Sequence, residues 1–184
     1  MLIILEILNH INNLYLLLNH KLDYGNFEKV YQFINSISNT RSVISNLNTI
    51  GKTTDSLKAA KNNLVLYLQM IHSLKSKFNF GSEDFSIRIE FSWKDSLLGD
   101  FSYSNNINLD YYSTLYNLGV VYGLLGQSAN IRDPDLNETS LKEAIKHFQY
   151  AGWLFDKIRN EVLSSLSSKE ITPDLAKDNL TFVS

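Results

Sequence analysis

The stretch from Leu109 to Leu166 carries the pattern that most constrains the fold. Apolar and small residues recur in it at spacings of three and four, so in each half they share one face of a helix. Their order of sizes is that of a tetratricopeptide repeat, in which small residues let two antiparallel helices approach closely. The pattern therefore predicts two long packed helices with Phe148 between them. Its members are Leu115, Leu118, Gly119 and Tyr122 in the first half, and Ala144, Phe148 and Ala151 in the second.

The tip between these two helices is longer than in the repeat. Tyr122 and Ala144 lie 22 positions apart, so the connection has gained roughly 13 residues. Lengthened surface loops often carry function. The added segment, residues 128–140, is acidic: it contains Asp133, Asp135 and Glu138 against Arg132.

The first half of the chain predicts further helices. Residues 1–20 are apolar, but polar residues interrupt the run well short of a membrane span, so we expect a buried helix. A second amphipathic helix is predicted over residues 26–47, after a turn at residues 23–25. A third carries a stripe at steps of three and four, which is typical of a core face. Its members are Leu57, Ala60, Leu64, Tyr67, Leu68, Ile71, Leu74 and Phe78.

After residue 81 the period changes from helical to alternating. Apolar residues at every second position from Phe85 to Trp93 predict a half-buried strand. A shorter alternation at Phe101 and Tyr103, beyond the turn at residues 98–100, predicts its hairpin partner. Two strands are not stable alone in water, so the pair must lie on the helices or find a third strand.

Composition and motifs argue against several classes of protein. A net charge of −2 without a basic run disfavours a nucleic-acid binder. The absence of cysteine excludes disulfides and thiolate metal sites, and favours a reducing, cytoplasmic compartment. The four histidines are scattered singly over different predicted helices, so we expect surface or satisfied residues and no metal site. No cofactor is expected.

Two acids could be mistaken for catalytic groups. Asp95 follows the strand without a second carboxylate or base in sequence, so capping of the turn explains it. Asp110 is placed where a helix N-cap belongs. The sequence therefore predicts no catalytic site.

Residues 51–53, Gly-Lys-Thr, resemble the end of a phosphate-binding loop. That motif needs a glycine at position 46, which is Asn46 here, and a preceding buried strand. We therefore expect a loop in which Thr53, Thr54 or Asp55 caps the next helix.

Four segments stand out in the sequence: KFNF at 77–80, IEFSWKD at 89–95, YNLG at 116–119 and LKEAIKHFQYAG at 141–152. In order and at similar spacing, they resemble the Bro domain of Alix and PalA-type proteins. The resemblance covers residues 27–184 and implies a mainly α fold of tetratricopeptide-like helical hairpins with a small antiparallel β-sheet. The chain is expected to form a single domain, residues 1–184, similar to the N-terminal half of a Bro domain.

The resemblance implies a non-catalytic scaffold in endosomal sorting. Bro domains bind the C-terminal helix of an ESCRT-III subunit, in the cytoplasm and at endosomes. The expected partners include no nucleic acid, and membrane contact is expected only through partners. The alternative is a generic tetratricopeptide-like adaptor that binds peptides in another process, such as signalling.

We expect the partner to dock at the start of the second long helix. Glu138 aligns with an acidic position that contacts the ESCRT-III helix in the family. Leu141 and Ile145 lie one helical turn apart and offer an apolar surface to an amphipathic helix, with charge at its edge. The alternative is that Leu141 belongs to the core and that Glu138 only favours the positive end of its own helix.

Overall fold

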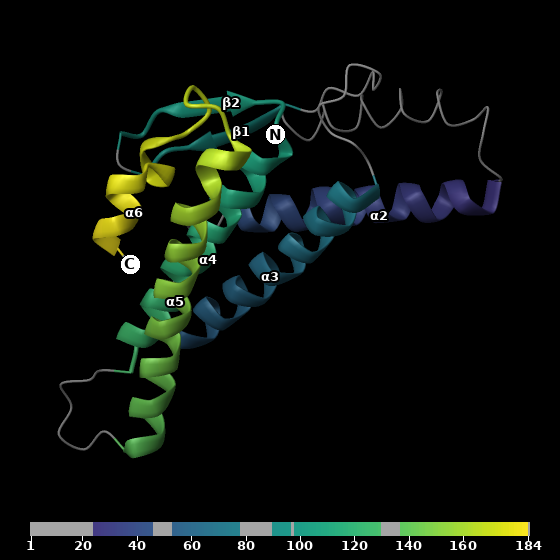
Figure 1. Ribbon diagram of the computed structural model, residues 1–184. Coiled ribbons are helices and arrows are strands. Elements are labelled where there is room, and N and C mark those ends of the chain that lie inside the picture. The colour runs from purple at the N-terminus through teal and green to yellow at the C-terminus, as the bar shows by residue number, and fades with distance from the viewer. Residues whose placement is uncertain (1–23, 46–52, 78–89, 97, 130–136, 184) are drawn as a thin grey trace.

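The computed structural model describes residues 24–45, 53–77, 90–96, 98–129 and 137–183 (Figure 1). Its elements follow in the order α2 (Tyr24–Ser45), α3 (Thr54–Lys77), β1 (Phe91–Lys94), β2 (Phe101–Ser104), α4 (Ile107–Gln127), α5 (Glu138–Ser165), the 3-10 helix η2 (Pro173–Leu175) and α6 (Lys177–Val183). The predictions for residues 1–20, 51–52, 78, 85–89 and 130–136 lie outside the described residues.

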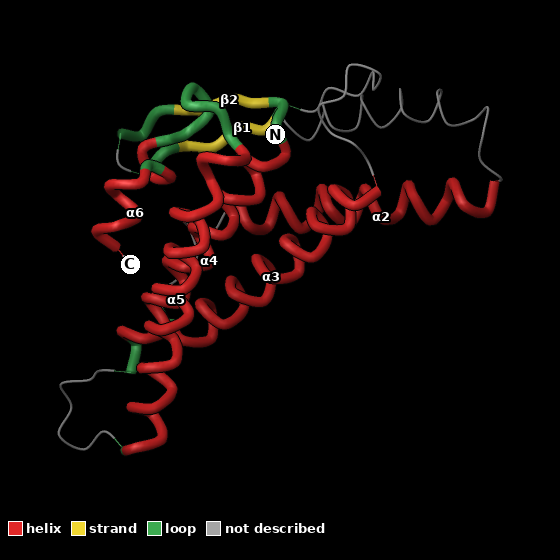
Figure 2. Tube along the Cα trace, in the orientation of Figure 1, coloured by secondary structure: helices red, strands yellow, loops and turns green. Residues whose placement is uncertain are grey.

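The helices pack in sequence order. Helix α4 lies between α3 and α5, and α2 packs on α3 (Figure 1). The β1–β2 hairpin and η2 both contact α4, and α6 packs on α5 (Figure 2). The mainly helical fold with a small antiparallel sheet is thus confirmed.

The predicted hairpin of long helices is formed by α4 and α5. Their close approach depends on glycine, because a Cβ on Gly119 would lie 2.8 Å from the Phe155 ring and a Cβ on Gly126 2.8 Å from the Phe148 ring. Contacts that short do not occur, so any larger residue would separate the helices. Leu115, Leu118, Ala144 and Ala151 are buried, as the repeat pattern predicts.

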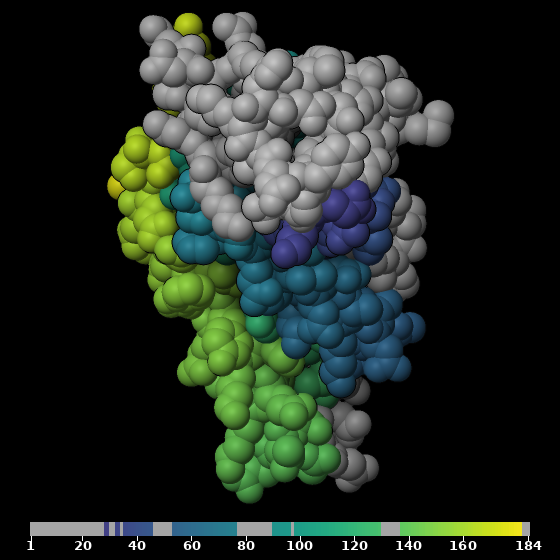
Figure 3. Space-filling view, turned by 90° about the vertical axis from the view of Figure 1, so that its right-hand side faces the viewer, coloured from purple at the N-terminus to yellow at the C-terminus, as the bar shows by residue number. Residues whose placement is uncertain are grey.

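The prediction that Phe148 is buried is wrong in part. Its ring lies against Gly126, but the residue is 38% exposed. The first turns of α5 project beyond α3, as the space-filling view shows (Figure 3). Phe155, two turns further along α5, takes the buried position that was expected of Phe148.

Side-chain caps define where the long helices begin. Thr53 Oγ1 accepts a hydrogen bond from the Ser56 amide at 3.3 Å, which confirms the predicted cap of α3. Asn106 caps α4 and Asn137 caps α5, at 3.0 and 2.9 Å. The prediction that Asp110 caps α4 is wrong, because Asp110 lies one turn inside the helix and is fully buried.

The two strands pair antiparallel, with Trp93 opposite Ser102 and Lys94 opposite Phe101. Gly99, at φ +77°, makes the tight connection between them. The inner face carries Phe91 and Trp93, as predicted. Phe101 and Tyr103 are on the outer face and mostly exposed, because the register places them opposite the outward side chains of β1.

Asp110 forms a buried polar cluster with residues of three other elements. Its carboxylate pairs with the Arg41 guanidinium of α2 and accepts hydrogen bonds from the Tyr67 hydroxyl of α3 at 2.6 Å and the Trp93 indole of β1 at 2.9 Å. Arg41 also donates to the Ser92 carbonyl at 3.2 Å. Burial raises the pKa of Tyr67, although the neighbouring Arg41 acts in the opposite direction. The cluster joins α2, α3, β1 and α4.

Removing one member of this cluster should be costly. Asp110→Asn leaves the Arg41 guanidinium buried without its counter-charge, which typically lowers the free energy of unfolding by about 3–5 kcal/mol. The double variant Arg41→Met/Asp110→Leu should lose less than the sum of the two single changes. Urea melts of the wild-type chain, Arg41→Met, Asp110→Leu and the double variant measure this coupling, and strictly additive losses would contradict it.

The uneven burial along the α4–α5 hairpin can also be measured. Phe155→Ala should cost about 3–5 kcal/mol, because it opens a cavity in the core. Phe148→Ala should cost about 1–2 kcal/mol, because part of the ring is already in water. Equal losses for the two variants in denaturant melts would show that Phe148 is a core residue after all.

Candidate partner-binding site

The first turns of α5 hold the three predicted site residues. Asn137 caps the helix, and Glu138 lies in the first turn, where a carboxylate favours the positive end of the helix dipole. Glu138 also forms an ion pair with Lys142, one turn further on. Both side chains are highly exposed, so this pair contributes little to stability. Its charges are available at the surface.

Leu141, Ile145 and Phe148 follow along one side of α5, and we call these three residues the α5 flank. Their spacing of four and then three places them in a single row on the helix. They are 37%, 47% and 38% exposed. The alternative that Leu141 belongs to the core is therefore wrong. The structure brings Leu141 and Ile145 together on one surface, as predicted, and adds Phe148.

Phe148 was missed as a surface residue because its spacing is that of the core. The repeat pattern places it correctly against the partner helix at Gly126. The pattern cannot tell that α3 does not reach this far along the hairpin. The only local signal was its position seven residues after Leu141, which places both on the same side of a helix.

The opposite side of α5 packs against aromatic side chains. The His147 ring lies 5.8 Å from that of Tyr122, and the Tyr150 ring 5.3 Å from it. His147 Nδ1 is buried and has no hydrogen-bond partner, so the expectation of a satisfied histidine is wrong for this atom. Burial, assisted by Lys61, lowers the pKa of His147.

Asp95 does have a second carboxylate beside it, contrary to the expectation from sequence. Asp95 accepts hydrogen bonds from the Leu98 amide at 2.8 Å and the Asp174 amide at 2.9 Å. Asp174 in turn accepts from the Ser96 amide at 2.7 Å and from the Ser96 hydroxyl. Both acids thus hold η2 to the strand turn. The predicted capping role is confirmed, and the partner was hidden because it lies 79 residues away in sequence.

The described ranges contain no cluster of histidine, aspartate and glutamate that could hold a metal ion. Among the same residues, no helix is both long and apolar enough to cross a membrane.

Comparison with solved structures agrees with this architecture. The chain is similar to ALIX in complex with the SIVmac239 PYKEVTEDL late domain, with a TM-score of 0.74 and 24% identity over 94% of this chain and 24% of the other. It is also similar to ALIX BRO1 in its CHMP4C complex, with a TM-score of 0.59 and 25% identity over 82% of this chain and 43% of the other. The first likeness, at this identity, concerns the fold alone.

Sequence comparison points to the same family. The chain is 31% identical over 135 residues to human programmed cell death 6-interacting protein, and 25% identical over 138 residues to the Xenopus laevis protein. Each match covers 71% of this chain and 15% of the relative, so the chain spans a small part of their length. The family model of the BRO1-like domain matches residues 12–184. The chain therefore belongs to the BRO1-like domain family.

Proposed function

We propose that this protein is a scaffold of the endosomal sorting pathway that binds the C-terminal helix of an ESCRT-III subunit. The observation that carries the proposal is the row of three exposed apolar side chains on α5 beside an exposed charged pair. Membership of the BRO1-like family supports it, together with the similarity to ALIX BRO1, which forms a complex with CHMP4C, an ESCRT-III subunit.

The geometry suits an amphipathic helix. Such a helix presents apolar residues at spacings of three and four, which can pack along Leu141, Ile145 and Phe148. Leaving these side chains in water is unfavourable, and covering them contributes roughly 25 cal/mol for each Å² of apolar surface. The α5 flank thus offers the partner both shape and driving force.

The charged pair at the start of α5 would set the direction of the partner. Glu138 and Lys142 lie one turn apart, and each can exchange its mutual ion pair for one with the partner. Exposed charges at the rim of an interface mainly affect specificity and association rate. A basic residue of the partner beside Glu138 would orient the bound helix.

The rest of the proposal follows from the role of a scaffold. The protein acts without catalysis, in the cytoplasm, and reaches endosomal membranes through its partners. Residues 1–184 form one domain similar to the N-terminal half of a Bro domain.

Titration of a fluorescently labelled C-terminal helix peptide of CHMP4C into the chain tests the site. Glu138→Lys and Leu141→Asp should each weaken binding by at least about tenfold, which corresponds to about 1.4 kcal/mol. Circular dichroism should show both variants folded, because the changed side chains are exposed. A Leu66→Asp variant is the matched control, since Leu66 is comparably exposed but lies on α3.

An unrelated acidic C-terminal peptide should not bind. If it binds as well as the CHMP4C peptide, the protein is a general peptide adaptor. If both α5 variants keep full affinity for CHMP4C, the partner docks elsewhere.

A further inference from the structure

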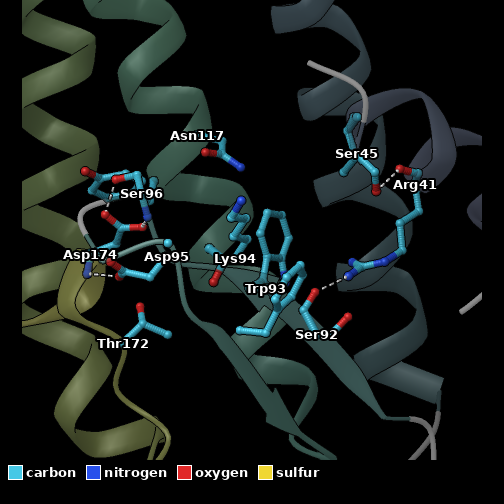
Figure 4. A pocket seen from close by; sticks show the side chains of 15 residues that line it. Arg41, Ser45, Ser92, Trp93, Lys94, Asp95, Ser96, Asn117, Thr172 and Asp174 are labelled. Carbon is cyan, nitrogen blue, oxygen red and sulfur yellow. Dashed lines mark hydrogen bonds between the residues drawn. The ribbon is translucent and has the colours of Figure 1, made fainter. Parts of the chain in front are cut away.

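One side of helix α4 is covered near its start and exposed further on. Tyr116 and Asn117 line a cavity together with residues of β1, of the strand turn and of the segment at η2 (Figure 4). Val120 and Gly123 follow Tyr116 at spacings of four and three, so these three residues lie in one row on α4. Val120 is 39% exposed and Gly123 is partly exposed. The row is therefore covered at Tyr116 and open to solvent one turn later.

Gly123 differs from the two glycines on either side of it in what lies above it. At Gly119 and at Gly126, a Cβ would lie 2.8 Å from a phenylalanine ring of α5. At Gly123, a Cβ would have no described atom of another element within 4 Å. The register of the antiparallel helices explains the difference, because Ala151 lies between the two phenylalanines and carries only a methyl group. Open space therefore remains above Gly123.

The packing of the chain gives no reason for a glycine at position 123. Glycine inside a helix is less favourable than alanine, because its backbone loses more conformational freedom on folding. Gly119 and Gly126 offset this cost by allowing the close approach of α5. Gly123 lies in the middle of α4 with an ordinary helical backbone and allows no such contact. A departure from local preference without a packing benefit is typical of a functional position.

The open space at Gly123 is continuous with the α5 flank. Phe148, which belongs to the flank, lies against Gly126, and Gly126 is one turn from Gly123 on the same side of α4. Exposed apolar surface thus extends from α5 across Phe148 to Val120 on α4. A helix that packs on two neighbouring helices inserts side chains into the spaces between theirs. The space at Gly123 is suited to one such side chain.

We propose, on the basis of the function proposed above, that the ESCRT-III helix lies over the junction of α4 and α5 and inserts a large apolar side chain above Gly123. Val120 and Phe148 contact this side chain from either side. Leu141 and Ile145 contact the neighbouring turns of the same partner helix. Gly123 is then a specificity-determining residue, because a larger residue in its place would exclude the inserted side chain.

Substitution of Gly123 should change stability and affinity in opposite directions. Gly123→Ala should raise the midpoint of urea unfolding, because alanine favours the helix and its Cβ meets no other element. The same variant should weaken binding of the labelled CHMP4C helix peptide by about threefold, and Gly123→Leu by at least about tenfold. A merely structural role for Gly123 would lower stability and affinity together.

A second set of titrations identifies the inserted side chain. Each apolar residue of the CHMP4C peptide is changed to alanine, and each peptide is titrated into the wild-type chain and Gly123→Leu. At one position the change should weaken binding to the wild type and improve binding to Gly123→Leu, because the shorter side chain leaves room for leucine. Ala59→Leu is the matched control, since Ala59 is exposed on α3, and it should leave affinity unchanged.

Three results would overturn the role of Gly123. If Leu141→Asp weakens binding and Gly123→Leu does not, the function proposed above stands, but the partner contacts α5 alone. If Gly123→Ala lowers the urea midpoint, or no peptide position compensates for Gly123→Leu, the space does not receive a partner side chain. If the wild-type chain does not bind the peptide at all, the proposed function fails and the role of Gly123 fails with it.

Discussion

The burial of Asp110 is the constraint on which the rest of the structure depends. A carboxylate without access to water must be paired and hydrogen-bonded, and here its partners come from α2, α3 and β1. These three elements can satisfy one carboxylate only in a single mutual arrangement. The cluster therefore sets the position of α4 relative to the first half of the domain, and α5 is then placed by its packing on α4.

The α4–α5 hairpin is closely packed along its length but is not covered evenly. Phe155 on Gly119 lies in the core, whereas Phe148 on Gly126 is partly in water, near the point at which α5 extends past α3. The same geometry leaves Leu141 and Ile145 exposed. The candidate partner-binding surface is thus a consequence of helix lengths: apolar residues continue along α5 beyond the point at which the third helix can cover them.

The strand hairpin is attached to the rest of the domain at two places. Its inner residues, Phe91 and Trp93, attach it to the helices, and Asp95 with Asp174 fastens its turn to η2. This anchoring holds β1 in place against the helices.

Local periodicity in the sequence determined the elements of the fold. Steps of three and four predicted the helices, alternation predicted the strand at Phe91 and Trp93, and the small residues Gly119, Ala144 and Ala151 predicted the close hairpin. These features can be predicted from the sequence because they depend on residues within one element or in the element that follows it in the chain. The family resemblance of the motifs predicted a scaffold function and pointed to Glu138, and the spacing of Leu141 and Ile145 on one helical turn added them to the candidate site.

Only the tertiary structure decided what depends on residues distant in sequence. Asp110 is of a residue type that often caps helices, and its burial is evident only once Arg41 and Tyr67 lie beside it. Asp95 acquires its second carboxylate from Asp174, and Phe148 keeps core spacing while its surroundings expose it. In each case the local pattern is the same for both outcomes, because burial is set by which other elements reach the residue and not by the residue's own neighbours in the chain.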